Sequence, residues 1–162
     1  MSSSRHTVVG VIGESDCGPD LYGMAEEAGR LVARRGAAVV CGGLGGVMEA
    51  ACRGATGEGG VTIGILPGGR KEDANPFVTI PLPTGMGEAR NVLVVRAADT
   101  IIAVGGRYGT LSEIALALKL GKPVVGLRTW ELYRQGRRED AFPVCETAAE
   151  AVSLAFQLIG QS

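Results

Sequence analysis

The chain has 162 residues, a length typical of a single domain that can bury its own hydrophobic core. Hydrophobic residues make up 46% and charged residues 20%, which excludes an intrinsically disordered chain. Sixteen basic and seventeen acidic residues give a net charge of −1, so we expect neither nucleic acid nor a membrane as a partner.

Apolar strands and amphipathic helices alternate along the sequence. In chain order we predict six strands, at 7–13, 37–41, 61–66, 77–80, 100–104 and 123–127. The helices between them are one that Asp20 caps and Gly36 ends, one that runs to Gly57, one at 86–97 and one that Gly121 ends. A last helix opens with a capping box at Thr147 and Glu150.

Strands that are apolar throughout and separated by helices are typical of a parallel sheet that is covered on both faces. We therefore predict an α/β fold, a single Rossmann-like, doubly wound parallel sheet with helices on both faces. It should form one domain over residues 1–162, with a flexible tail at 1–6. The polar segment 130–140 is expected to be a surface excursion.

Few residues are available for familiar catalytic chemistry. The only histidine, His6, lies in the serine-rich tail, which argues against Ser-His-Asp, Cys-His and histidine-based metal sites. The four cysteines form no CxxC pair, which favours a reducing, cytoplasmic location over a disulfide framework or a zinc site. We expect no bound metal in the protein's own site.

Glycine is the compositional outlier, with 26 residues, and its richest segments directly follow predicted strands. The carboxyl ends of parallel strands meet at one edge of a sheet, where open α/β sheets bind ligands. Glycine lets backbone amides approach a ligand, and a helix N-terminus attracts anions. Two loops therefore favour a phosphate, although such glycines also form simple tight turns; their candidate binding residues are Gly43, Gly45, Gly46, Gly105, Gly106, Arg107, Gly109 and Thr110.

Two common nucleotide motifs are absent. The pattern GxGxxG fails after Gly43 and Gly45, because Met48 stands at the third glycine position. The pattern GxxxxGK[ST] fails at Gly121 and Lys122, because Pro123 follows. Neither NAD nor a nucleoside triphosphate is indicated.

The segment 106–113, GRYGTLSE, resembles the PGGxGTxxE signature of the LOG (Lonely Guy) proteins, a Rossmann-like superfamily also called lysine decarboxylase-like. Arg90 and Asn91 precede Asp99 as an Arg-Lys pair does in that family, and segment 42–48 is similar to its first glycine loop. The resemblance covers residues 7–128 in matching order.

Three positions depart from the family pattern: Gly105 replaces proline, Arg107 replaces glycine and Asn91 replaces lysine. With these three residues, the sequence resembles a short bacterial branch of the family. That branch also resembles the molybdenum-cofactor carrier proteins, which bind a phosphorylated pterin and need catalyse no reaction.

The resemblance implies a phosphoribohydrolase that splits a nucleoside 5′-monophosphate into base and ribose 5-phosphate without a required cofactor. Gly106, Gly109 and Thr110 would hold the phosphate, Glu113 would activate water, and Arg90 would stabilise charge. The alternatives are a carrier of the molybdenum cofactor or of another phosphorylated small molecule, and a nucleotide-sensing module. Relatives of this kind assemble into dimers or larger, so we expect a homo-oligomer, a dimer or a tetramer.

The candidate catalytic residues also have purely structural interpretations. Thr110 and Glu113 have the spacing of a capping box, which would engage the carboxylate with a backbone amide. Arg90 has the interpretation of a surface helix arginine. The polar residues Glu14 to Asp16 follow the first strand and either contact a base or ribose or simply form a turn.

Overall fold

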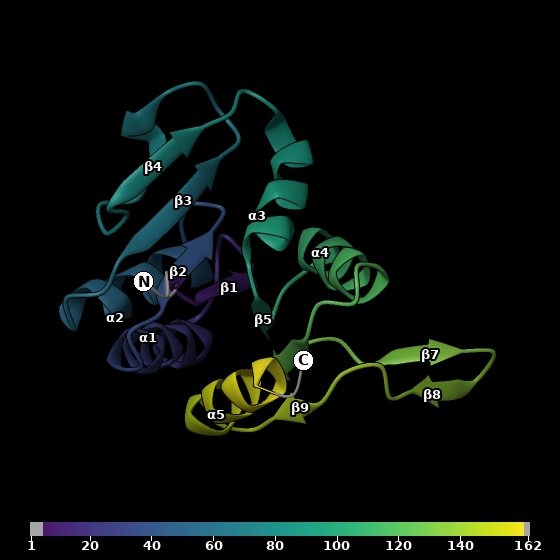
Figure 1. The fold of residues 1–162 in the computed structure, drawn as a ribbon. Helices are drawn as coiled ribbons and strands as arrows, with labels where there is room; N and C mark the ends of the chain where they lie inside the picture. The colour runs from purple at the N-terminus through teal and green to yellow at the C-terminus, as the bar shows by residue number, and fades with distance from the viewer. Residues whose placement is uncertain (1–4, 161–162) are drawn as a thin grey trace.

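A seven-stranded parallel sheet forms the centre of the protein, which we describe from a computed structural model of residues 5–160 (Figure 1). Every neighbouring pair of strands is parallel. The order across the sheet is β4-β3-β2-β1-β5-β6-β9, which confirms the predicted doubly wound fold. The strands are β1 (Val8–Gly13), β2 (Ala38–Cys41), β3 (Thr62–Leu66), β4 (Ile80–Pro83), β5 (Thr100–Val104), β6 (Val124–Leu127) and β9 (Val144–Cys145).

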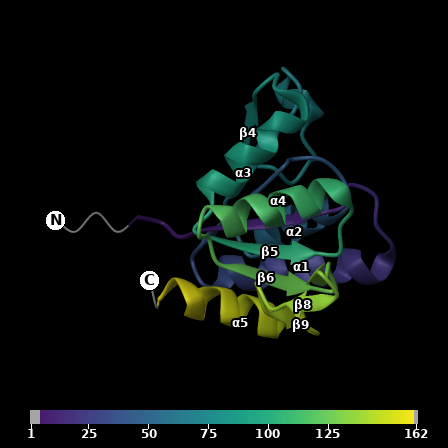
Figure 2. The same ribbon diagram turned by 90° about the vertical axis from the view of Figure 1, so that its right-hand side faces the viewer.

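Helices cover both faces of the sheet, as Figures 1 and 2 show from two sides. One face packs against α1 (Pro19–Arg34), α2 (Val47–Gly57) and α5 (Ala148–Ile159). The other face packs against α3 (Asn91–Ala97) and α4 (Tyr108–Lys119). None of the helices in the described part of the chain has the length and hydropathy needed to span a membrane.

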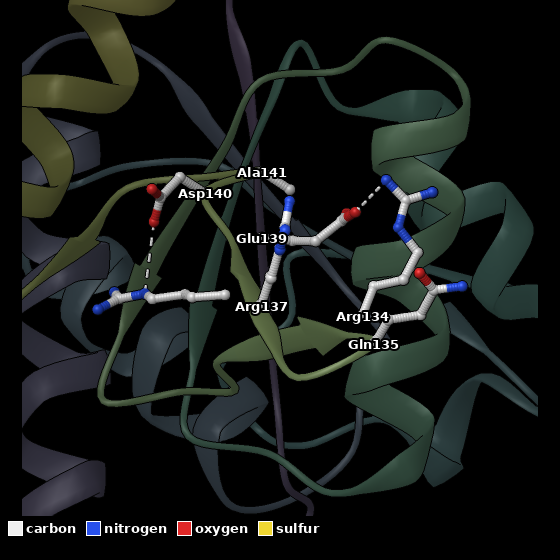
Figure 3. A pocket seen from close by; sticks show the side chains of 7 residues that line it. Arg134, Gln135, Arg137, Glu139, Asp140 and Ala141 are labelled. Carbon is white, nitrogen blue, oxygen red and sulfur yellow. Dashed lines mark ion pairs between the residues drawn. The ribbon is translucent and has the colours of Figure 1, made fainter.

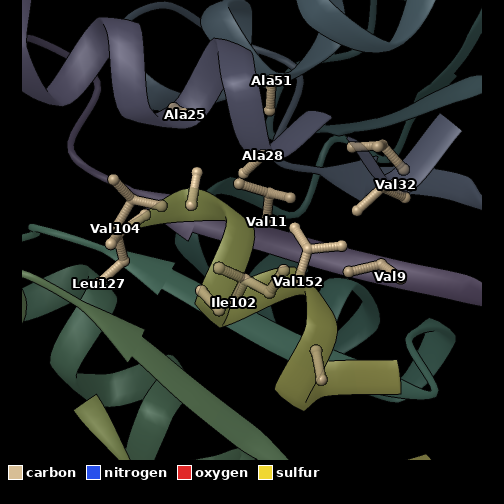
Figure 4. Packing of buried hydrophobic residues seen from close by; sticks show 14 of the residues in the cluster. Val9, Val11, Ala25, Ala28, Val32, Ala51, Ile102, Val104, Leu127 and Val152 are labelled. Carbon is tan, nitrogen blue, oxygen red and sulfur yellow. The ribbon is translucent and has the colours of Figure 1, made fainter. Parts of the chain in front are cut away.

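The two-residue period of the strands divides the core into two layers. Val9 and Val11 of β1 point toward α1 and α5, where they meet Ala28 and Val152 (Figure 4). Ile12, one residue on, packs on the opposite face with α3 and α4. Because both layers are apolar, the central strands read as continuous hydrophobic runs in the sequence.

The prediction of a strand at 77–80 was wrong by several residues, because β4 spans Ile80–Pro83. Phe77 lies in a turn, where its backbone N–H donates to the side chain of Asn75 over 3.0 Å. Pro81 and Pro83 are tolerated inside β4 because it is an edge strand, where a missing backbone donor need not face a neighbour.

Other helix boundaries also differ from the sequence predictions. Asp20 does not cap α1, because Gly18 is the N-cap residue and Pro19 opens the helix, which places Asp20 inside the first turn. The predicted helix 86–97 divides into a 3-10 turn, η2 (Gly87–Arg90), and α3. The capping box of α5 is confirmed at its first half, since the Thr147 hydroxyl accepts from the Glu150 N–H over 3.2 Å.

The polar segment 130–140 forms an antiparallel hairpin of β7 (Leu132–Arg134) and β8 (Arg137–Glu139), which extends away from the body of the protein (Figure 1). A short 3-10 turn, η1 (Lys71–Asp73), follows β3. Most of the tail predicted at 1–6 lies outside the described residues. The predictions of one domain and of a homo-oligomer stay predictions.

Candidate ligand-binding site

A cleft of about 610 Å³ opens at the carboxyl ends of the central strands. It lies where the strand order reverses, since the chain runs from β1 to β2 on one side and enters β5 on the other. Such a reversal leaves a crevice between loops that diverge in opposite directions. The lining residues used below come from the ends of β1 and β2, from η2 and from the starts of α2, α3 and α4: Glu14, Gly42, Met48, Glu88, Arg90, Asn91, Arg107, Tyr108, Gly109, Thr110 and Glu113.

Arg90 is a buried residue of the cleft wall and not a surface arginine, with only 8% of its area exposed. Its Nε donates to the backbone oxygen of Ile65 over 3.0 Å, and a terminal nitrogen donates to the Asn91 side chain. Burial lowers the pKa of the Arg90 guanidinium, and the nearby Glu113 carboxyl opposes that effect. The side chain therefore carries a positive charge into the cleft from a fixed position.

Gly42 gives Arg90 the room to reach the cleft. A Cβ atom at this position would lie 2.8 Å from both the Arg90 guanidinium and the Met48 sulfur. Any side chain at position 42 would therefore displace the ends of the Arg90 and Met48 side chains. Gly42 was part of the predicted loop but was not among the candidate binding residues.

Glu113 also points into the cleft and is 8% exposed. The capping-box interpretation was wrong: α4 begins at Tyr108 with Arg107 as N-cap, so Thr110 lies inside the helix. No residue of the described chain donates a hydrogen bond to the Glu113 carboxyl. Burial raises its pKa to about 7, against the opposing effect of Arg90. Glu113 can therefore accept or release a proton near neutral pH.

The loop before α4 contributes part of the predicted phosphate site to this cleft. Arg107, Gly109 and Thr110 line it. The first N–H groups of a helix have no acceptor within the helix, so the start of α4 offers free donors to an anion. Gly105 and Gly106 instead line a smaller neighbouring cavity of about 340 Å³.

Three glycines of the first loop, Gly43, Gly45 and Gly46, lie outside the cleft lining, although Gly42 of the same loop belongs to it. Gly43 packs against the backbone of Gly64, and Gly45 and Gly46 pack against the backbone of Ser15. These contacts explain the need for glycine without a ligand. A role of Gly43, Gly45 and Gly46 in binding stays a prediction.

Several cleft residues carried little or no signal in the sequence. Glu14 follows a strand end, and the sequence left open whether it contacts a base or ribose or simply forms a turn. Met48 has the pattern of a packing residue, although it lines the cleft. Glu88 belongs to no recognised motif, and Tyr108 stands at a variable position of the GRYGTLSE segment, so only the folding of η2 and α4 places them here.

The cleft combines charges of both signs, with carboxyl groups at Glu14, Glu88 and Glu113 and guanidinium groups at Arg90 and Arg107. Within residues 5–160, no group of three or more histidine, cysteine, aspartate or glutamate side chains is placed to hold a metal ion. The arrangement suits a small polar ligand that has both an anionic group and hydrogen-bond donors.

Another cavity, of about 560 Å³, lies beside the β7–β8 hairpin (Figure 3). Four of its charged side chains pair with one another: Arg134 with Glu139 at 2.5 Å and Arg138 with Asp140 at 3.4 Å. These groups are already neutralised in exposed pairs, so this cavity offers less to a ligand than the cleft does.

Comparisons with known proteins agree with this architecture. The chain is 47% identical over 146 residues to an uncharacterized protein of Archaeoglobus fulgidus, covering 90% of this chain and 91% of that protein. The molybdenum cofactor binding protein of Rippkaea orientalis is 35% identical with a TM-score of 0.87, and the match covers 97% of this chain and 99% of that one.

The molybdenum cofactor carrier protein of Chlamydomonas reinhardtii is 34% identical with a TM-score of 0.81, covering 96% of this chain and 99% of that one. The model of the SLOG cluster4 family matches residues 6–152. That match spans the whole sheet and the cleft, and it confirms the superfamily that the GRYGTLSE segment indicated. The chain belongs to the SLOG cluster4 family.

Proposed function

We propose that this protein is a carrier that binds the molybdenum cofactor, a phosphorylated pterin, in the cleft at the carboxyl ends of β1, β2 and β5. The observation that supports this proposal best is the similarity of nearly the whole chain to two proteins named for that ligand, at 34% and 35% identity. This was the alternative to hydrolysis in the sequence analysis.

The chemistry of the cleft fits such a ligand at two ends. The amides of Tyr108, Gly109 and Thr110 at the start of α4 are donors for a phosphate. A pterin ring carries N–H groups, and the Glu113 carboxyl is an acceptor without a hydrogen-bonding partner in the described chain. The cleft volume of about 610 Å³ lies within the ordinary range for small-molecule sites.

Cofactor loading tests the proposal directly. The protein is produced in cells that make the cofactor and purified without oxygen. Molybdenum is then measured by elemental analysis and the pterin by its fluorescence after oxidation. We expect both in nearly equal amounts, and transfer of the molybdenum to an apo-molybdoenzyme. A chain that stays empty after incubation with free cofactor would contradict the proposal.

A matched variant ties loading to the cleft. A Cβ atom at Gly109 meets no other atom within 4 Å, so G109D fits the fold while placing a negative charge among the α4 amides. We expect G109D to lose the cofactor and keep its thermal stability. Equal loading of G109D and the wild type would place the ligand elsewhere.

One observation favours hydrolysis of a nucleoside 5′-monophosphate as a second function. Glu113, with a pKa raised to about 7, lies beside the positive charge of Arg90. A carboxyl with that pKa can take a proton from water as the water attacks the ribose carbon, while the bond to the base breaks. Incubation with several nucleoside monophosphates and assay of free base tests it. Release that exceeds an E113Q control would support the enzyme, and release equal to that control would exclude it.

A further inference from the structure

The carboxyl group of Glu14 already binds a backbone amide in the loop before α4. Its Oε1 accepts from the backbone N–H of Gly106 over 3.2 Å, and its Oε2 lies 3.7 Å from Nε of Arg107. Glu14 lines both the cleft and the smaller cavity, so it stands between them. A side-chain carboxyl therefore holds donors that an anionic ligand at this end of the cleft would use.

The surrounding structure holds Glu14 in this position. Its backbone oxygen accepts from the N–H of Val47 at the start of α2 over 3.0 Å, which fixes the main chain. A Cβ atom at Gly105 would lie 2.9 Å from Oε1 of Glu14, so the loop closes tightly on the side chain. The side chain is only 18% exposed, whereas that of Arg107 is 85% exposed.

The same part of the cleft contains a second sign of a ligand. Glu113, on the first turns of α4, is 8% exposed, faces the cleft and receives no hydrogen bond from the described chain. Every fully buried side-chain nitrogen or oxygen of the described chain has a partner, so the Glu113 carboxyl oxygens are open to the cleft, where a ligand with an N–H or O–H group can donate to them. Near the start of α4, the Glu113 carboxyl is thus free to bind a ligand in the cleft, whereas the Gly106 amide is already bound by the Glu14 carboxyl.

We infer that Glu14 is a built-in competitor for the anionic group of the ligand at the Gly106–Arg107 end of the cleft. A phosphate at the start of α4 must either displace the Glu14 carboxyl or bind beside its negative charge, and both weaken binding. This role suits a protein that has to release its ligand to a recipient. It rests on the proposed function only in that a phosphorylated ligand enters the cleft.

The test titrates inorganic phosphate into the wild type, E14Q, E14A and D20N at constant ionic strength, with binding followed by the amide resonances of Gly106 and Gly109. E14Q keeps the shape of Glu14 and removes its charge. D20N removes one charge at an exposed side chain in the first turn of α1, which lines neither the cleft nor the smaller cavity. We expect E14Q and E14A to bind phosphate about tenfold more tightly than the wild type, and D20N to change much less.

Several results would overturn the inference. Phosphate affinity in E14Q equal to or weaker than the wild type would show that Glu14 does not compete, and equal tightening by D20N would reduce the effect to net charge. Absence of phosphate binding by all four proteins would also overturn it. The proposed function is judged separately by molybdenum loading, so either can fail alone. Unchanged unfolding temperatures would show that the variants are folded.

Discussion

The two glycine loops have similar sequences but different surroundings in the structure. In the first, at 42–46, the three glycines other than Gly42 lie outside the cleft lining and pack against protein backbone. In the second, at 105–109, Gly105 and Gly106 also pack against protein, whereas Gly109, at the start of α4, meets no other atom within 4 Å and borders the cleft. A glycine after a strand leaves room beside the backbone, but it does not show whether protein or ligand uses that room.

The largest expected effect comes from the first loop. In Gly46→Ala, the new Cβ would lie 2.3 Å from the backbone oxygen of Glu14, at a φ of +61°. The clash and the positive φ together should lower the free energy of unfolding by about 4 kcal/mol. Denaturation in urea measures this value. A loss below about 1 kcal/mol would mean that position 46 is as unhindered as Gly109 in the second loop.

The next effect concerns α4, which begins at the second loop. Burial raises the pKa of Glu113 to about 7, from an ordinary value of 4.5. Between these two pH values the folded protein binds more protons than the unfolded protein. The free energy of unfolding of the wild type therefore falls as the pH rises from 4.5 to about 7. At pH 8, E113Q should be more stable than the wild type by about 3 kcal/mol, and near pH 4 the two should be similar. Urea denaturation across pH 4–8 measures the difference. Parallel curves for the two proteins would contradict the buried, proton-binding role.

A smaller effect is expected where the two regions meet. Gly42→Ala would place a Cβ atom 2.8 Å from the Arg90 guanidinium. Because that guanidinium is the end of a long side chain, it can shift, and we expect a loss of about 1 kcal/mol in stability. The larger consequence should be weaker binding of the anionic ligand, measured by the same phosphate titration. A variant that binds as the wild type does would show that Arg90 takes no part.

The smallest expected effect is also the sharpest contrast between the loops. Gly109→Ala, in the first turn of α4, meets no atom within 4 Å. Alanine has a higher helix propensity than glycine, so the variant should gain about 0.5 kcal/mol in thermal or urea denaturation. If G109A were less stable than the wild type, Gly109 would have to be packed against protein as Gly46 is.

Much of the fold could be predicted because its signals are local. The apolar runs at β1 and β5 and the glycines after them predicted the sheet and the edge at which the cleft opens. The errors fell at positions where local rules compete, as at β4, where prolines mislead unless the strand is known to lie at an edge. The cleft itself was predicted in outline through Arg90, Glu113, Arg107, Gly109 and Thr110.

By itself, the sequence determined the doubly wound sheet and the family, because strand period, helix faces and the GRYGTLSE segment depend on residues close together in the chain. Tertiary structure alone decided that Glu113 is buried with a pKa near 7, that Gly42 makes room for Arg90, and that Glu14 reaches the Gly106 amide. Each of these depends on contacts between segments far apart in the sequence. Such contacts change burial and charge, which no local pattern of residue types records.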